Sequence, residues 1–356
     1  MIKQIGIIIL VSSLFNALNA QNSWENVDSV GLTYIYEQRL YRNPKEAISN
    51  PVEGRTYIPQ VGGIPIGRYQ FKQNKWFVSE LNDPQKWSSK VRTGKTHRLD
   101  FSILPTFSAQ FGNFLQPVES KTAILLQTHI LLAKGLQFQG SLAFPFQNSL
   151  DRQPNELRFG PSFFSYFNRI GIKNFVMVST GYFFTDQYGI NFQYRNWSPT
   201  RLLNWGFEFS KTGQYFFYQD GQYHGKLDQS VGLGYLSFRI PKHNVTLQVI
   251  GGQFMYNDLG IRTEFIRQFT RVDVGLWISS TQNGSTLGFN FAIPLFPSSI
   301  KKPYILLGKG KLAPRLRMSE EFRWEYTYSR GVQIAERYRL APRLDERLRM
   351  YEKGYW

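Results

Sequence analysis

The chain has 356 residues, no cysteine and a formal net charge of +17 at pH 7. The absence of cysteine excludes disulfide bonds, cysteine-ligated metal sites and lipid attachment through an N-terminal cysteine. Phe, Tyr and Trp make up 16% of the residues, although the mean hydropathy is negative. This combination is typical of membrane β-barrels, which have a polar lumen and aromatic girdles, and it also occurs in soluble β-sandwiches.

Residues 1–20 have the features of a secretory signal peptide. Lys3 supplies a positive charge, residues 5–15 form a short apolar stretch, and small residues up to Ala20 precede a cleavage site before Gln21. The stretch is too short to span a bilayer as a helix, which makes a retained anchor the weaker alternative. No later stretch approaches the ~20 apolar residues of a membrane helix. We therefore expect Sec-type export. If the mature protein lies in a membrane, we expect it to cross that membrane as β-strands.

Residues 21–300 are predicted to form the main domain, with one interruption near its start. Residues 44–66 are rich in Pro and Gly and break the strand pattern. We expect a long loop there, either extracellular or folded into the lumen.

Alternating apolar and polar side chains recur along the rest of this domain. The segments are 99–111, 136–146, 189–196, 203–210, 271–278 and 285–296. A period of two indicates an extended strand with one apolar face. Several of these runs have about nine to eleven residues, which suits a tilted membrane strand, whereas sandwich strands usually have about five or six. We predict about 12 to 16 strands between residues 29 and 296.

The polar faces of these strands carry charged residues at mid-strand. They are Arg195, Glu208, Arg271 and Asp273. In a soluble sandwich these side chains would face bulk water, and in a barrel they would face a polar lumen. With the signal peptide and the aromatic content, the pattern favours an all-β fold, a transmembrane antiparallel outer-membrane β-barrel with lumen-facing charges.

Residues 301–356 have a different character. They contain nine Arg and five Lys against seven acidic residues, a net charge of +7. The final membrane strand is predicted to end near Leu295, which leaves this basic segment as a periplasmic tail. Within it, EFRWEYTYS could form one more strand, and LDERLRMYEK has helical charge spacing. Five arginines are candidates for docking a partner protein or an anionic glycan, or for contacting solvent and lipid phosphates: Arg315, Arg317, Arg323, Arg343 and Arg347.

No motif for catalysis, metal binding or cofactor binding is present. The four histidines are scattered without the paired spacing of a zinc site. Neither a GxSxG nucleophile elbow nor a GxxxxGK[ST] phosphate loop occurs. The aromatics alternate along strand faces instead of lining a basic groove, which argues against nucleic-acid binding. We therefore expect a protein that is not an enzyme and takes no cofactor.

The stretch VDVGLWISSTQNGSTLGFNFAIPL, residues 272–295, resembles the YjbH family of outer-membrane proteins, which includes the GfcD-type proteins of capsule operons. The matching positions are Asp273, Gly275, Gly288, Ile293, Pro294 and Leu295. Typical members look like two linked barrel halves, so the resemblance implies a short or single-barrel relative. It also implies a non-catalytic barrel that assists the export or surface assembly of extracellular polysaccharide.

Two other functions fit an exported barrel. One is a structural or secretion-machinery barrel of the Bacteroidetes envelope, like the PorP/SprF proteins, although the FSQY…NPA segment of those proteins is missing from residues 21–45. The other is a general diffusion porin. In each case we expect the outer membrane of a Gram-negative bacterium, contact with its lipid, and partners among extracellular polysaccharide and envelope export proteins.

Overall fold

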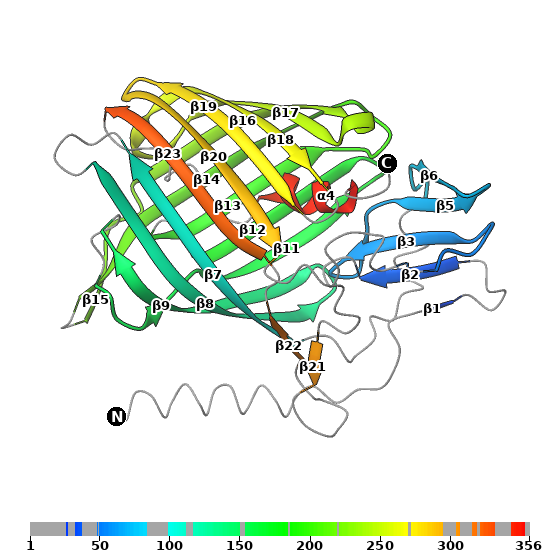
Figure 1. The fold of residues 1–356 in the computed structure, drawn as a ribbon, viewed down its shortest axis with the longest axis horizontal. Helices are drawn as coiled ribbons and strands as arrows, with labels where there is room; N and C mark the ends of the chain where they lie inside the picture. The colour runs from blue at the N-terminus through cyan, green and yellow to red at the C-terminus, as the bar shows by residue number, and fades with distance from the viewer. Residues whose placement is uncertain are drawn as a thin grey trace.

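The computed structural model of the chain is all-β, with a large sheet, a smaller sheet and a short helix (Figure 1). The structure describes residues 26–27, 33–37, 48, 50–83, 99–111, 117–149, 154–183, 186–218, 221–269, 272–294, 304–306, 315–318, 321–331 and 343–352. The predicted signal peptide lies outside these residues.

Thirteen long strands build the large sheet. They are β7 (Leu99–Phe111), β8 (Val118–Ala133), β9 (Leu136–Asn148), β11 (Ser162–Ile170), β12 (Asn174–Tyr182), β13 (Gln187–Asn196), β14 (Leu203–Tyr218), β16 (Gln229–Ile240), β17 (Val245–Gln253), β18 (Leu259–Gln268), β19 (Asp273–Thr281), β20 (Gly284–Pro294) and β23 (Glu321–Gly331). From β7 to β20, strands that follow one another in this series pair antiparallel.

The pairing order of the large sheet returns to its first strand. β20 pairs antiparallel with β23, and β23 pairs in parallel with β7, so the strands form a barrel. Because neighbouring strands alternate in direction, an odd number of strands brings the first and the last together in the same direction. The parallel pair is therefore a consequence of the strand number.

Short elements extend the strands at the ends of the barrel. β10 (Arg158–Phe159) pairs with β9, β15 (Gly221–His224) with β14, and β22 (Arg315–Met318) with both β7 and β21 (Tyr304–Leu306). Two 3-10 turns, η4 (Pro241–His243) and η5 (Met255–Asn257), connect strands at opposite ends.

The smaller sheet comes from the N-terminal part of the chain. Its strands are β1 (Asn26–Val27), β2 (Thr33–Glu37), β3 (Thr56–Val61), β4 (Ile64–Pro65), β5 (Arg68–Lys72) and β6 (Lys75–Ser79). They are arranged in the order β1-β2-β3-β5-β6, with β4 beside β3. The range 44–66 was expected to be a loop, but it contains β3, whose six residues are all buried. Gly62 and Gly63 have positive φ and make the tight β3–β4 turn, so the glycines that suggested a loop belong to a hairpin.

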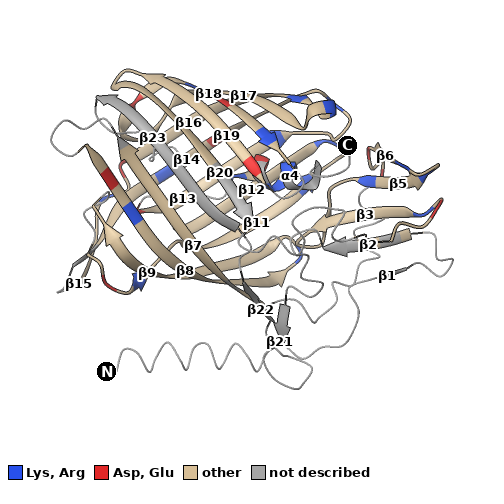
Figure 2. Ribbon diagram, in the orientation of Figure 1, with Lys and Arg blue, Asp and Glu red and all other residues tan. Residues whose placement is uncertain are grey.

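The two faces of the barrel wall have opposite polarity. In β20, Leu287 is 51% exposed on the outside, whereas Thr286 is 7% exposed on the inside. The same alternation holds in the strands from β9 to β19. Outward apolar side chains include Phe164, Val178, Ile190, Phe209, Leu236, Val249, Phe265, Leu276 and Ile278. Inward polar side chains include Gln137, Ser165, Ser179, Asn191, Ser210, Gln248, Arg262 and Ser279. In Figure 2, long stretches of the strands carry no charged residue.

Two clusters of buried apolar side chains lie toward the two ends of the barrel. One joins the barrel wall to the smaller sheet and consists of Ile48, Tyr57, Val61, Ile64, Ile66, Tyr69, Phe167, Phe175, Met177, Trp197, Leu344 and Leu348. The other lies near the β17–β18 turn and consists of Phe163, Phe183, Val231, Leu233, Tyr235, Ile250, Phe254 and Met255. The polar part of the interior lies between these clusters.

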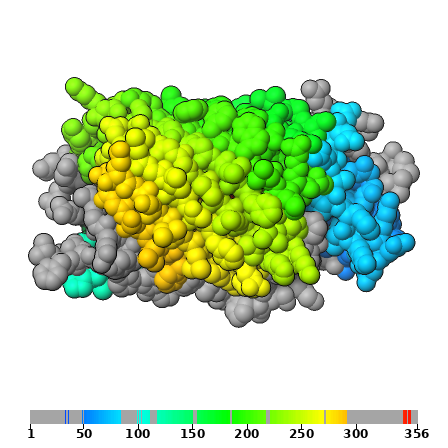
Figure 3. Space-filling view, turned by 90° about the horizontal axis from the view of Figure 1, so that it is seen from above, coloured from blue at the N-terminus to red at the C-terminus, as the bar shows by residue number. Residues whose placement is uncertain are grey.

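The smaller sheet is docked against one end of the barrel (Figures 1 and 3). The backbone N–H of Gly135, in the β8–β9 turn, donates to the carbonyl oxygen of Gly62 at 2.7 Å. Arg169 Nη1 donates to the carbonyl oxygen of Pro65 at 3.0 Å. The Lys173 ammonium lies 3.0 Å from the Glu80 carboxylate. Together with the shared apolar cluster, these contacts hold the sheet over this end of the barrel.

The docked turn allows a test that separates steric clash from backbone strain. Gly135 and Gly171 have φ of +73° and +71° and lie in turns at the same barrel end. A Cβ at Gly135 would overlap the Phe167 carbonyl oxygen, whereas a Cβ at Gly171 meets no atom within 4 Å. We expect Gly171→Ala to lower the free energy of unfolding by about 1–2 kcal/mol. Gly135→Ala should lose about 1–3 kcal/mol more. Urea unfolding measures both, and equal losses would contradict this account.

Candidate functional site

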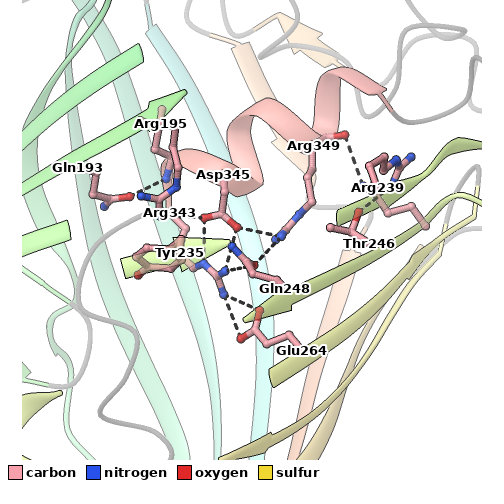
Figure 4. A network of polar contacts seen from close by, with 12 residues as sticks. Gln193, Arg195, Tyr235, Arg239, Thr246, Gln248, Glu264, Arg343, Asp345 and Arg349 are labelled. Carbon is pink, nitrogen blue, oxygen red and sulfur yellow. Dashed lines mark hydrogen bonds and ion pairs between the residues drawn. The ribbon is translucent and has the colours of Figure 1, made fainter. Parts of the chain in front are cut away.

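The described residues contain one α-helix, α4 (Leu344–Glu352), and it lies against the inner wall of the barrel (Figure 4). Asp345 and Arg349 are one turn apart and form an ion pair of 2.8 Å. Leu344 and Leu348 share another face of the helix and are both buried in the apolar cluster under the smaller sheet. In the described part of the chain, no helix has the length and apolar character needed to cross a membrane.

Arg343, the residue before α4, forms the main polar contact between the helix and the wall. Its Nη1 donates to both carboxylate oxygens of Glu264 in β18, at 3.2 and 3.0 Å. Its Nη2 donates to Gln248 Oε1 in β17 at 2.6 Å and to Asp345 Oδ2 at 2.8 Å. All four side chains are buried, so these charged groups satisfy one another away from bulk solvent.

The two ends of α4 are tied to the wall by glutamines. The backbone N–H of Leu344 donates to Gln193 Oε1 in β13 at 2.8 Å, which satisfies one of the free donors of the first helical turn. Gln268 Nε2 in β18 donates to the Arg349 carbonyl oxygen at 3.5 Å. Arg349 Nη1 also donates to Gln248 Oε1 at 3.1 Å. Three strands of the wall therefore hold one short helix.

Further polar side chains line the wall beside the helix. Arg262 Nε donates to Glu264 Oε1 at 2.7 Å, and the Arg262 guanidinium lies over the Trp277 ring at 3.9 Å. Glu208 accepts hydrogen bonds from Asn191 at 2.6 Å and from the Tyr235 hydroxyl at 2.5 Å. These side chains converge because the period of two sends every second residue of neighbouring strands into the same interior.

Arg195 faces the helix from β13. Gly206 lies opposite it on β14, and a Cβ at Gly206 would approach Arg195 Cδ to 2.5 Å. The missing side chain therefore leaves room for the guanidinium, which lies over the Tyr235 ring at 3.8 Å. Arg195 Nη2 is 3.7 Å from Asp345 Oδ1, the longest of the ion pairs in the network.

The structure describes three of the four residues that were predicted to face the lumen. Arg195 and Glu208 are buried on the inner face of the wall. Asp273 begins β19 in phase with the inward-facing Trp277 and Ser279. Arg271 lies outside the described residues.

The expectation of a separate tail after residue 300 differs from the structure. β23 lies in the barrel wall between β20 and β7, so the last wall strand does not end near Leu295. Arg323 belongs to β23, and Arg315 and Arg317 belong to β22, beside β7. Arg343 is buried in the barrel and Arg347 lies on α4, where both face the chain's own residues. The thirteen long strands of the large sheet lie within the predicted 12 to 16, although the strands before residue 99 form the smaller sheet and β23 follows residue 296.

Sequence reasoning missed most of the wall residues that hold the helix, namely Gln193, Tyr235, Gln248 and Glu264. A local signal existed for Glu264, which alternates with apolar residues in LGIRTEFIRQ and shares its phase with Arg262 and Gln268. It also existed for Asp345 and Arg349, through their helical spacing. No local pattern predicts which of these groups contact one another, because Arg343 and Glu264 are 79 residues apart in the sequence.

Comparisons with protein-family models, with curated proteins and with solved structures found no match. Among the described residues, no group of three or more His, Asp or Glu side chains is placed to hold a metal ion.

The docking of the smaller sheet should depend on pH through Glu80. Its carboxylate accepts hydrogen bonds from Ser198 Oγ at 2.7 Å and Thr200 Oγ1 at 3.2 Å, besides the ion pair with Lys173. Partial burial raises the pKa of Glu80, but the hydrogen bonds and the Lys173 charge outweigh it and lower that pKa from its usual 4.5. A lowered pKa stabilises the docked sheet above pH 4.5 and loses that effect as the pH falls below it.

Hydrogen exchange of the β3–β6 backbone measures this docking. We expect faster exchange in wild-type protein below pH 4.5 than above it, after correction for intrinsic exchange. Glu80→Gln should exchange faster at neutral pH and show less pH dependence. The variant Glu156→Gln changes an exposed carboxylate and is the control, which should keep the pH dependence of the wild type. Equal behaviour of Glu80→Gln and wild type would contradict the assignment to Glu80.

Proposed function

We propose that the protein is an outer-membrane β-barrel whose interior is occupied by its own C-terminal helix. The observation that carries the proposal is the polarity of the wall, with large apolar side chains outside and amides, hydroxyls and charges inside. A water-soluble sandwich has the reverse arrangement, because exposed apolar surface of this extent is unfavourable in water. Lipid as the outer solvent makes the same arrangement favourable.

Aromatic residues on the outer face support the membrane assignment. Tyr182 and Tyr188 pair across β12 and β13 near one end, with ring centroids 6.4 Å apart. Tyr194 and Trp205 lie near the other end of β13 and β14, with centroids 5.4 Å apart. Between them the outward residues of β13, Ile190 and Phe192, are apolar. Aromatic side chains at two levels around an apolar band are typical of interfacial girdles.

We further propose a non-catalytic role in the export or surface assembly of extracellular polysaccharide. Amide and hydroxyl groups line much of the interior, and such groups exchange hydrogen bonds with sugar hydroxyls. The resemblance of residues 272–295 to the YjbH family supports the same role. A role as a structural or secretion-machinery barrel is the second candidate, favoured by the smaller sheet docked at one barrel end, where an envelope partner could bind.

A general diffusion porin is the least favoured of the barrel functions. Such a porin needs an unobstructed aqueous lumen. Here α4 and the inward-facing apolar side chains of two buried clusters occupy the interior, and the smaller sheet is docked against one end.

Two measurements test the proposal in order. The folded protein should fractionate with outer membranes and should shift its gel mobility on boiling in detergent, whereas recovery as a soluble periplasmic protein would overturn the barrel assignment. Surface and released polysaccharide should then fall in a deletion strain and return with the wild-type chain. Normal polysaccharide in the deletion strain would overturn the polysaccharide role and favour the secretion-machinery barrel.

A further inference from the structure

We infer that Arg195, beside the helix α4, is the centre of a binding site for a carboxylate-bearing sugar chain, and that Asp345 shields this site while the helix is in place. This inference rests on the proposed function and specifies its substrate class. Its parts are the Arg195 guanidinium, the Tyr235 ring and the amides of Gln193 and Gln248.

Arg195 is held rigidly but is only partly satisfied. Its side chain is 4% exposed, and Nη1 donates to the carbonyl oxygens of Tyr194 at 2.9 Å and Phe207 at 3.1 Å. Nε and Nη2 have no hydrogen-bond partner among the described residues. A buried guanidinium with two free N–H groups is unfavourable alone and matches the two oxygens of a carboxylate. The Tyr235 ring at 3.8 Å fixes the plane of the guanidinium.

Asp345 lies near this guanidinium without binding it closely. Its carboxylate accepts hydrogen bonds from Arg343 at 3.0 and 2.8 Å, and it forms a 2.8 Å ion pair with Arg349. The Arg195 nitrogen is 3.7 Å away, too far for a hydrogen bond. A ligand carboxylate can therefore bind Arg195 while Asp345 keeps its bonds to the arginines of its own helix segment.

The charges around the helix also favour an added anion. Near α4 the described side chains include the buried Arg195, Arg239, Arg262 and Arg343 and the partly buried Arg349, against the buried Glu208, Glu264 and Asp345. This excess of positive charge attracts acidic chains into the interior. Gln193 and Gln248 already accept hydrogen bonds from the helix segment, and the same amides can bind sugar hydroxyls once the helix withdraws.

Ligand binding and the docking of α4 are therefore expected to compete for the same side chains. A carboxylate on Arg195 removes the attraction between Arg195 and Asp345, and a sugar ring beside Tyr235 competes for the amides that hold α4. Because the ligand binds only when the helix is withdrawn, any change that raises the population of the withdrawn state tightens ligand binding in proportion to that population. An acidic glycan would thus promote its own entry into the barrel.

The test uses the full-length protein in lipid vesicles, with a galacturonate oligosaccharide as probe and a dextran oligosaccharide of equal length as neutral control. Calorimetry should show at least about tenfold tighter binding of the acidic chain. Asp345→Asn should tighten it by about a further tenfold, and Arg195→Gln should abolish the preference. Arg195→Lys should restore part of it, because a lysine keeps the charge without the fork geometry. The exposed Arg201→Gln variant is the matched control and should bind like wild type.

Each outcome has a distinct meaning. Equal binding of acidic and neutral chains, or unchanged binding by both Arg195→Gln and Asp345→Asn, would overturn the inference. Equal inhibition by acetate at the same carboxylate concentration would reduce it to an adventitious anion site and also overturn it. Protein that fails to insert into vesicles would overturn the proposed barrel instead. Retained heat-dependent gel mobility in each variant shows that loss of binding does not come from misfolding.

Discussion

Reversing the charge of Arg343 should release α4 and open the barrel to ions. Arg343→Glu removes the hydrogen bonds to Glu264 and Gln248, and it places a third carboxylate beside Glu264 and Asp345. Breaking a buried ion pair by removing one partner costs about 3–5 kcal/mol, and like charges add to that cost. In planar bilayers we expect rare openings of the wild-type protein and steady conductance of the variant. Trypsin should also cleave the variant faster in α4, at Arg347 or Arg349.

A matched control and a compensating change make this result specific. Arg201→Glu makes the same charge reversal at an exposed position near the barrel end and should leave conductance unchanged. Glu264→Arg combined with Arg343→Glu restores an opposite-charge pair and should recover part of the closure. Equal conductance of wild type and Arg343→Glu would show that the helix does not block the barrel.

Placing a charge on the outer face should destabilise the protein only if that face contacts lipid. Leu276 is 54% exposed in the middle of β19, so Leu276→Arg would be close to neutral in a water-soluble protein, within about 0.5 kcal/mol. In a bilayer, an arginine near the midplane of a barrel costs about 2–4 kcal/mol. We expect the larger loss in the free energy of unfolding, measured with urea in lipid vesicles.

Leu227→Arg provides the control, because Leu227 is 47% exposed and lies in the loop between β15 and β16. It should change the free energy of unfolding by less than about 0.5 kcal/mol. The difference between the changes in the free energy of unfolding of the two variants then shows whether lipid or water surrounds each side chain. Two equally small effects would mean that water, and not lipid, covers the outer face of β19.

The sequence by itself determined the strands and the two faces of each strand. In β20, the alternation from Thr286 to Phe289 shows which side chains share a face, because successive side chains of a strand point in opposite directions. The same rule placed Arg195 and Glu208 on the polar faces of β13 and β14, and in the structure both are buried. These features depend only on neighbouring residues, so they can be read locally.

Strand membership was harder to predict where the local signals conflicted. Residues 44–66 contain the Pro and Gly that suggest a loop. Their backbone nevertheless forms β3 and a tight turn, which pack against one end of the barrel. EFRWEYTYS has strand character, but its basic surroundings suggested a tail. Only the pairing of β23 with both β20 and β7 places it in the wall.

The site inside the barrel was decided by the tertiary structure. Arg343 looked like one of several arginines of a basic tail, available to an outside partner. Closure of the sheet into a barrel brings Gln193, Gln248 and Glu264 from three strands to one side of the interior. The helix segment supplies the hydrogen-bond donors that these side chains accept. No local pattern encodes this match, because it depends on which residues of distant strands face the same enclosed space, where low solvent access makes each buried charge require a partner.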